Sequence, residues 1–140
     1  MPASTHLLPA HTLAQRARDF AGFTYRISDG TFPRDGFAVA ISKGPERELL
    51  AAPTPDDIEQ FYRDNLQTIV AGNVVFKGGV CLGAWQGADR WYLDLTIVVR
   101  SLDEALVLGR QNAQMAVYDL GEGHAIAIPW NPEPANPLAS

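Results

Sequence analysis

The stretch from Val80 to Leu120 reads VCLGAWQGADRWYLDLTIVVRSLDEALVLGRQNAQMAVYDL, and its pattern decides the fold. An apolar run, Val80–Trp85, leads into a turn around Gly87 and then into the long segment Trp91–Arg100. In this segment five apolar side chains alternate with the others, at Trp91, Leu93, Leu95, Ile97 and Val99. Ten residues rich in aromatic and β-branched side chains predict a central strand, joined to the preceding strand as a hairpin.

A capped helix and another strand are predicted next. Ser101 and Glu104 have the spacing of a capping box, in which each side chain satisfies a backbone donor of the other. The helix is expected over Leu102–Asn112, where Gly109 costs about 1 kcal/mol relative to alanine, so we expect a close approach of another element there. Met115–Leu120 then alternates as a strand. Strand, helix and strand together predict a βαβ crossover, right-handed if the two strands lie parallel in one sheet.

The N-terminal part predicts one helix and three short strands. A second capping-box spacing places a helix start at Thr12, and Gly22 is a plausible stop for that helix. Alternation predicts strands at Phe23–Ile27 and Phe37–Ile41. Arg47–Leu50 is a further short strand, close enough along the chain to form a hairpin with Phe37–Ile41.

The clearest helix start in the chain is Thr54-Pro55. Threonine is a good N-cap, and proline fits the first helical position because its missing N–H has no partner there. The predicted helix ends at Gly72, and one apolar face is expected from Ile58, Phe61, Tyr62, Leu66, Ile69 and Val70. Val74–Phe76 is apolar and β-branched, and Ala125–Ile128 can pair back as a hairpin.

Together these elements predict an α+β fold. We expect two layers, with a mostly antiparallel sheet packed by two or three helices and containing one βαβ crossover. A chain of 140 residues is the usual size of one domain. The predicted organisation is a flexible N-terminal arm at 1–11, a single domain at 12–128 and a Pro-rich C-terminal tail at 129–140.

Charge and composition exclude several classes of function. The net charge is −5, with a balance of +1 over residues 1–50 and −6 over residues 51–140. Without a Lys/Arg cluster, a nucleic-acid surface is disfavoured, whereas the acidic second half can meet a basic partner. No apolar run suggests a membrane span, and no secretion signal is present. One cysteine fits a reducing compartment, so we expect a cytoplasmic protein.

Asp94 is the most interesting charged residue, because aspartate is depleted in the middle of strands. One interpretation is a carboxylate in a pocket, with Arg110 and Gln111 from the following helix nearby. The other is an aspartate on the solvated face of the sheet, or one paired with an arginine on a neighbouring strand such as Arg26. The second interpretation is favoured, because a single carboxylate is not a catalytic or metal-binding set.

The remaining reactive residues indicate no catalytic, metal or cofactor site. Cys81 lies inside an apolar run and is expected to be a small buried side chain rather than a nucleophile. His124 lies near Asp119 and Glu122, but two carboxylates and one histidine in a turn are a sparse ligand set. We therefore expect neither a metal nor a cofactor.

Aromatic side chains are the stronger candidates for a binding site. Trp85 and Trp91 flank the predicted hairpin turn, and Trp85 is placed to be partly exposed with Tyr92 near it. Such residues are natural anchors for a partner, although aromatic pairs also lock hairpins. Trp130, between Pro129 and Pro132, either docks in a groove of another protein or folds back on its own domain.

The segment from about Gly36 to Ile128 resembles a group of small, functionally uncharacterised proteins from actinobacteria and their bacteriophages. The residues that carry this resemblance are Gly83-Ala84-Trp85, Tyr92-Leu93-Asp94, Asp103-Glu104-Ala105, Gly109 to Gln114, Ala116 and Tyr118 to Leu120. The resemblance implies no activity. It implies an accessory role in a phage or mobile element, where small acidic proteins often bind and block another protein.

Three functional hypotheses follow. The leading one is a non-enzymatic protein-binding accessory protein, such as an inhibitor or immunity-type partner, with binding residues Trp85, Tyr92, Asp94, Arg110, Gln114 and Trp130. The second is a small enzyme or ligand-binding domain with a pocket around Asp94, Arg110 and Gln114. The third is a structural virion or assembly protein. The sequence leaves the oligomeric state and the identity of any partner undetermined.

Overall fold

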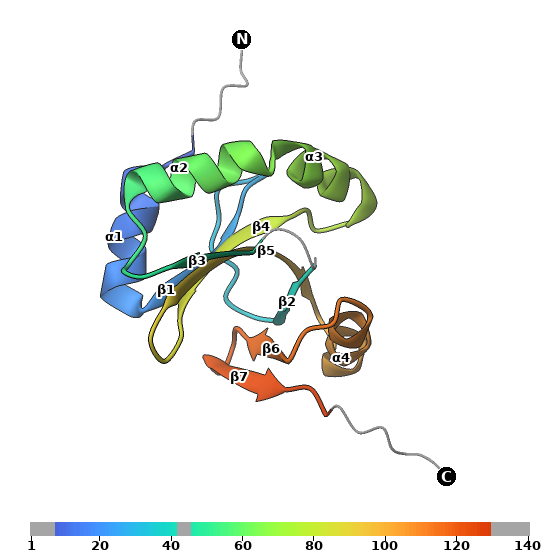
Figure 1. Ribbon diagram of the computed structural model, residues 1–140. Helices are drawn as coiled ribbons and strands as arrows, with labels where there is room; N and C mark the ends of the chain where they lie inside the picture. Colours follow the sequence, from blue (N-terminus) through green and yellow to red (C-terminus); the bar gives the residue numbers. More distant parts are fainter. Residues whose placement is uncertain (1–7, 42–45, 130–140) are drawn as a thin grey trace.

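The computed structural model describes residues 8–41 and 46–129, in which four helices pack against a seven-stranded sheet (Figure 1). The α+β prediction is confirmed, with four helices rather than two or three. In chain order the elements are α1 Ala10–Phe20, β1 Gly22–Arg26, β2 Phe37–Ala40, β3 Glu46–Leu49, α2 Pro55–Asp64, α3 Leu66–Val75, β4 Cys81–Gln86, β5 Trp91–Val99, α4 Leu102–Gln111, β6 Ala116–Asp119 and β7 His124–Ala127. None of the helices in these ranges is long and apolar enough to span a membrane.

The long strand β5 is the centre of the sheet, as its composition predicts. The strand order is β1-β4-β5-β2-β6-β7, and every pair is antiparallel. The predicted β4–β5 hairpin is confirmed, with Gly87 donating its backbone N–H to the Arg90 carbonyl. β6 and β7 form a second hairpin, also as expected.

The sheet also contains the predicted βαβ arrangement. β5 and β6 both run antiparallel to β2, which lies between them. The two strands joined by α4 are therefore parallel to one another in the same sheet, and the connection crosses over β2.

β2 and β3 do not form a hairpin with each other, contrary to one sequence expectation. Both pair antiparallel with β5, β2 opposite its second half and β3 opposite its first half. Phe37 lies opposite Val99, and Leu49 lies opposite Trp91. β5 has nine residues and is long enough to pair with β2 and β3 one after the other. β3 therefore runs in the same direction as β2, whereas a hairpin would reverse it.

All four helices pack against one face of the sheet, and the alternation in β5 explains why. Leu93, Leu95 and Ile97 point to the same side and are buried. A larger core lies under α1, α2 and α3, and a smaller core under α4 contains Val39, Ile97, Ala105, Val117 and Ile128. Trp91 is buried with this face, as predicted. The opposite face, which we call the helix-free face, carries the alternate side chains of the same strands.

The helix starts follow local capping rules where the cap residue has the right geometry. At α2 the predicted cap forms a complete capping box, with Thr54 Oγ1 3.1 Å from Asp57 N and Asp57 Oδ2 2.9 Å from Thr54 N. At α4, Ser101 Oγ accepts from the Glu104 N–H at 3.0 Å. The expected start of α1 at Thr12 is wrong, because buried Ala10 extends the helix by two residues into the segment assigned to an N-terminal arm.

The predicted helix from Thr54 to Gly72 is two helices, α2 and α3, separated at Asn65. α3 continues to Val75, so the apolar segment Val74–Phe76 lies partly in a helix and not in a strand. The single apolar face is also wrong, because Ile58, Phe61 and Ile69 are buried while Leu66 and Val70 are exposed. The change of axis at Asn65 turns these two side chains away from the sheet.

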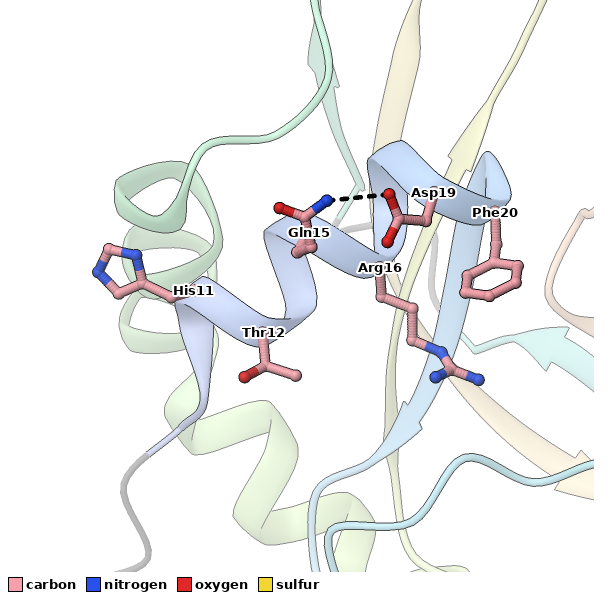
Figure 2. A pocket seen from close by; sticks show the side chains of 6 residues that line it. All are labelled: His11, Thr12, Gln15, Arg16, Asp19 and Phe20. Atoms are coloured by element: carbon pink, nitrogen blue, oxygen red, sulfur yellow. Dashed lines mark hydrogen bonds between the residues drawn. The ribbon is translucent and has the colours of Figure 1, made fainter.

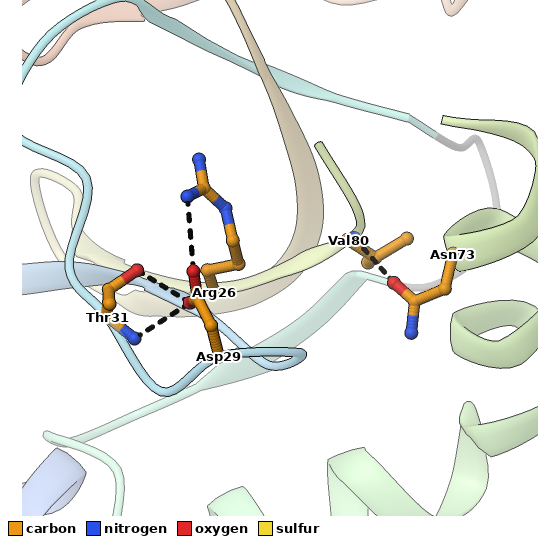
Figure 3. Close-up of polar contacts among 5 residues, drawn as sticks. All are labelled: Arg26, Asp29, Thr31, Asn73 and Val80. Atoms are coloured by element: carbon orange, nitrogen blue, oxygen red, sulfur yellow. Dashed lines mark hydrogen bonds and ion pairs between the residues drawn. The ribbon is translucent and has the colours of Figure 1, made fainter. Parts of the chain in front are cut away.

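Two groups of polar contacts hold the chain, one after β1 and one between α3 and β4 (Figure 3). After β1, Asp29 Oδ1 accepts from the Thr31 hydroxyl at 2.6 Å and from its N–H at 3.1 Å, which lowers the pKa of Asp29. Arg26 forms an ion pair with the same carboxylate. Near the end of α3, Asn73 Oδ1 accepts from the Val80 N–H at 2.8 Å and fixes the chain as it enters β4.

Gly109 allows a close approach of α4 to Ile128 and to Val117 of β6, as its occurrence in a helix suggested. A Cβ atom at this position would overlap Ile128 Cδ1 and lie 3.3 Å from Val117 Cγ1. The overlap costs about 1–3 kcal/mol, against a gain in helix propensity of about 1 kcal/mol. Gly109→Ala is therefore expected to lower the free energy of unfolding by about 1 kcal/mol, measured by urea denaturation.

The matched control introduces Gly109→Ala together with Ile128→Val, a substitution that removes the overlapping methyl group. The Gly109→Ala change should cost less stability in the Ile128→Val background than in the wild-type background. An equal cost in both backgrounds would contradict a direct contact between Gly109 and Ile128.

Candidate functional site

The helix-free face brings together three of the binding residues that the sequence singles out, Trp85, Tyr92 and Asp94. Three neighbouring rows of side chains cross it. Trp85 lies opposite Tyr92, Gly83 opposite Asp94 and Cys81 opposite Thr96 on the β4–β5 hairpin. β1 adds Thr24 and Arg26 on one side, and β3 adds Glu46 and Glu48 on the other.

Trp85 and Tyr92 form a stacked pair on this face. Their ring centroids are 4.3 Å apart with an interplanar angle of 20°. Trp85 is 44% exposed, as its predicted place near the end of the strand implied. Its indole Nε1–H donates to Asp94 Oδ2 at 3.2 Å, so the ring is held by a stacking contact and a hydrogen bond at once. The pair is therefore an exposed aromatic surface with a fixed orientation.

Asp94 is buried, with 8% of its surface exposed, although the four helices lie on the other face. It does not lie on a solvated surface, and among the described residues Arg26 pairs with Asp29, at 3.5 Å, rather than with Asp94. Gly83, directly opposite, leaves room for the carboxylate, because a Cβ there would overlap Asp94 Oδ1. The carboxylate therefore lies over the backbone of β4, against the edge of the Trp85 ring.

Burial raises the pKa of Asp94 to about 6; the Trp85 hydrogen bond opposes this rise and the Glu46 charge adds to it. Glu46 is the cross-strand neighbour of Asp94, and burial followed by the charge of Glu48 raises the pKa of Glu46 as well. Like charges directly opposite one another in a sheet are destabilising. A positive charge that approaches Glu46 and Asp94 would therefore reduce the repulsion between the two carboxylates.

Two buried polar atoms on the same face have no hydrogen-bond partner among the described residues, Arg26 Nε and Thr96 Oγ1. Both side chains nevertheless act on Cys81, because polar contacts of Arg26 and Thr96 with its thiol lower the pKa of that thiol against the larger effect of burial. Between them lies the Cys81 thiol, whose pKa burial raises to about 11. A thiol with this pKa is a poor nucleophile, in agreement with its expected packing role.

Arg110 and Gln114 do not join Asp94. Arg110 is exposed at the end of α4, on the side of the sheet that carries the helices. Gln114 follows that helix, and its Nε2 donates to the Asn112 carbonyl at 3.0 Å. The structure thus gives no support to a pocket built from these three residues. Trp130 lies outside the described residues.

A hollow of about 390 Å³ lies on the outer side of α1 and contains none of the predicted site residues (Figure 2). Two of its polar side chains are joined, with Gln15 Nε2 donating to Asp19 Oδ1 at 2.9 Å. The Arg16 guanidinium lies 3.8 Å from the centroid of the Phe32 ring. The helix-free face, which carries Trp85, Tyr92 and Asp94, is therefore the better candidate site.

Sequence reasoning missed Glu46, Glu48 and Thr96 as members of this face. The signal for Thr96 was present, since it follows Asp94 by two residues and must share its side of the strand. The signal for the two glutamates was absent, because their place depends on β3 pairing with β5.

Within the described ranges no group of three His, Cys, Asp or Glu side chains could hold a metal ion. His124 is exposed, and its Nδ1 lies 3.3 Å from the Ala125 carbonyl oxygen. The candidate site is thus an aromatic and acidic surface on the helix-free face. The chain matches no protein-family model, no curated protein and no solved structure.

Proposed function

We propose that this chain is a non-enzymatic protein-binding module that recognises a basic segment of its partner through the helix-free face. The observation that carries the proposal is the Trp85 side chain, which is exposed, stacked on Tyr92 and hydrogen-bonded to Asp94. A ring already held in one orientation loses little entropy on binding, which favours a role as an anchor.

The charges near the anchor support a basic partner. Glu46 and Asp94 lie side by side, and burial contributes to the raised pKa of both. A lysine or arginine side chain of a partner would relieve their repulsion and can also lie against the face of the Trp85 ring. This arrangement fits an inhibitor or immunity-type protein that covers a positively charged surface.

The test is affinity capture from a native lysate with three versions of the full chain as bait. The wild-type chain and a Val107→Ala control, changed at an exposed site on α4, should enrich the same proteins. Trp85→Ala should weaken binding of those proteins at least about tenfold, because central aromatic anchors carry much of the binding energy. Binding should be measured on the purified pair by calorimetry.

Asp94 gives the same interaction a pH dependence. Since its pKa is about 6, the carboxylate is largely ionised at neutral pH and loses its charge as the pH falls below 6. Binding of a basic partner should weaken over that range. Equal capture by the wild-type and Trp85→Ala baits, with no effect of pH, would exclude this face as the binding surface.

A further inference from the structure

β3 is paired along one edge, and its other edge is open among the described residues. The strand pairs with β5, and no described strand pairs with its outer edge. β6 does not fill this place, because it pairs with Phe37 and Ala38 of β2. An open edge presents backbone N–H and C=O groups, so an extended segment of another protein can add to it as a further strand.

The hydrogen bonds of β5 determine which groups of β3 point outward. The Ile41 N–H donates to the Leu95 carbonyl, and the bonding side alternates along a strand, so the odd-numbered residues of β5 bond towards β2 and β3. Arg47 lies opposite one of these residues and therefore bonds to β5. The N–H and C=O groups of its neighbours, Glu46 and Glu48, thus point away from β5. They have no backbone partner within the described ranges.

The charges of β3 select the kind of strand that fits this edge. Glu46 and Glu48 are exposed on the helix-free face. Glu48 bonds to Arg90 at 3.0 Å, whereas Glu46 has no ion-pair partner among the described residues. Arg47, between them, lies on the other face and bonds to Asp64 at 2.7 Å. A lysine or arginine opposite Glu46 therefore gains a cross-strand ion pair, whereas one opposite Arg47 meets a like charge.

A second copy of this chain does not fit the same edge. Since the outward backbone groups belong to Glu46 and Glu48, an antiparallel register that joins two β3 strands places a glutamate opposite a glutamate. Like charges directly opposite one another in a sheet are destabilising. The charges thus point to a different, basic chain as the occupant.

We propose that a basic extended segment of the partner adds antiparallel to the outer edge of β3, with a lysine or arginine opposite Glu46. This inference rests on the proposed function, because it describes how the basic segment proposed there is held. The antiparallel direction places bonded residues directly opposite each other with their side chains on one face. The basic side chains therefore alternate along the segment and share the helix-free face with Glu46 and Glu48.

The probe is a short peptide of alternating lysine and threonine, titrated into the isotope-labelled full chain and followed by NMR. In the proposed strand the lysine N–H groups point to β3 and the threonine N–H groups point away. N-methylation of the lysines should weaken binding at least about tenfold, because it removes the hydrogen bonds to β3. N-methylation of the threonines, the matched control of equal charge, should change binding less than about twofold.

The variants of the chain locate the bound peptide. The backbone amides of Glu46 and Glu48 should show the largest changes in chemical shift. Glu46→Gln should weaken binding about two- to fivefold through loss of the cross-strand ion pair. Glu122→Gln, which removes an equal charge at an exposed site, should bind as the wild type does. Equal binding of the two methylated peptides, or a greater loss on threonine methylation, would overturn the proposal.

A further variant separates this inference from the proposed function. Glu48→Pro removes an outward N–H and obstructs the edge without removing a bond to β5. Used as bait, it should lose the proteins that Trp85→Ala loses. Proteins lost by Trp85→Ala but kept by Glu48→Pro would overturn strand addition and leave the proposed function standing. If the peptides behave as expected and Trp85→Ala captures the same proteins as the wild type, strand addition stands and the Trp85 anchor falls.

Discussion

Replacing Asp94 with asparagine is expected to raise the free energy of unfolding at about pH 7.5 by about 2–3 kcal/mol, since each pKa unit corresponds to 1.36 kcal/mol. The native structure raises the pKa of this carboxyl group from 3.8 to about 6, chiefly by burial. Asparagine has nearly the same shape, carries no charge and keeps an oxygen that can accept from Trp85 Nε1. It therefore removes the cost of a buried charge and keeps the contact.

The sign of the pH dependence follows from the raised pKa. Between about pH 4 and pH 6 the native state of the wild type binds more protons at Asp94 than the unfolded state. The stability contributed by protonated Asp94 is full below pH 4 and is lost as the pH rises through 6. The advantage of Asp94→Asn should thus be near zero at pH 4 and reach its full value above pH 6.

The measurement is urea denaturation of both proteins at several pH values. Asp35→Asn, which changes an exposed carboxylate, is the control and should show no such trend. Glu46→Gln should give part of the same gain, because the Glu46 charge contributes to the raised pKa of Asp94. An asparagine variant that is less stable than the wild type at every pH would show that the charged form of Asp94 is stabilised in the native state.

The same substitution connects stability with the proposed function. If the Asp94 carboxylate binds a basic partner, the Asp94→Asn variant should be more stable than the wild type and yet bind that partner more weakly. Such opposite changes are typical of binding sites that hold a strained or poorly solvated group.

The second large effect is expected for Gly22→Ala, which should lower the free energy of unfolding by about 2–4 kcal/mol through backbone strain and overpacking. Gly22 has φ +150°, a conformation that residues with a side chain rarely adopt. A Cβ there would lie 2.5 Å from the Ala84 carbonyl oxygen and 3.3 Å from Trp85 Cα. Both neighbours are backbone atoms of β4, so they cannot move away without disturbing the pairing of β1.

Gly78→Ala is the matched control for this change. A Cβ at Gly78 would have the Val98 carbonyl oxygen, at 3.9 Å, as its nearest neighbour, which is an ordinary contact. This variant should stay within about 0.5 kcal/mol of the wild type, as most surface substitutions do. Thermal and urea denaturation of the three proteins would check both values. Equal stability of Gly22→Ala and the wild type would show that alanine fits at position 22 without backbone strain.

Local patterns were enough to predict much of the fold. Alternation located β5, and the Thr54 and Ser101 caps located the starts of α2 and α4, because neighbours in sequence supply both signals. The sequence likewise indicated that Trp91 would be buried and Trp85 exposed. These properties depend on residues within a few positions of each other, so they can be inferred from the local sequence alone.

Pairing between distant segments could be settled only by the tertiary structure. The pairing of β3 with β5 placed Glu46 beside Asp94, although the two lie far apart along the chain, and the register of β4 placed Trp85 Nε1 on the same carboxylate. The break at Asn65 turned Leu66 and Val70 outward, although their spacing fits one apolar face.

The sequence by itself therefore determined β5 with its alternating faces, the β4–β5 hairpin and the starts of α2 and α4. The tertiary structure decided that Asp94 is buried without a cation among its described contacts, that Arg110 belongs to the other side of the sheet and that Leu66, Val70 and Val74 of α3 are exposed among the described residues. The physical reason is that burial and charge–charge contacts arise from segments far apart in the chain, whereas periodicity and capping arise within a single segment.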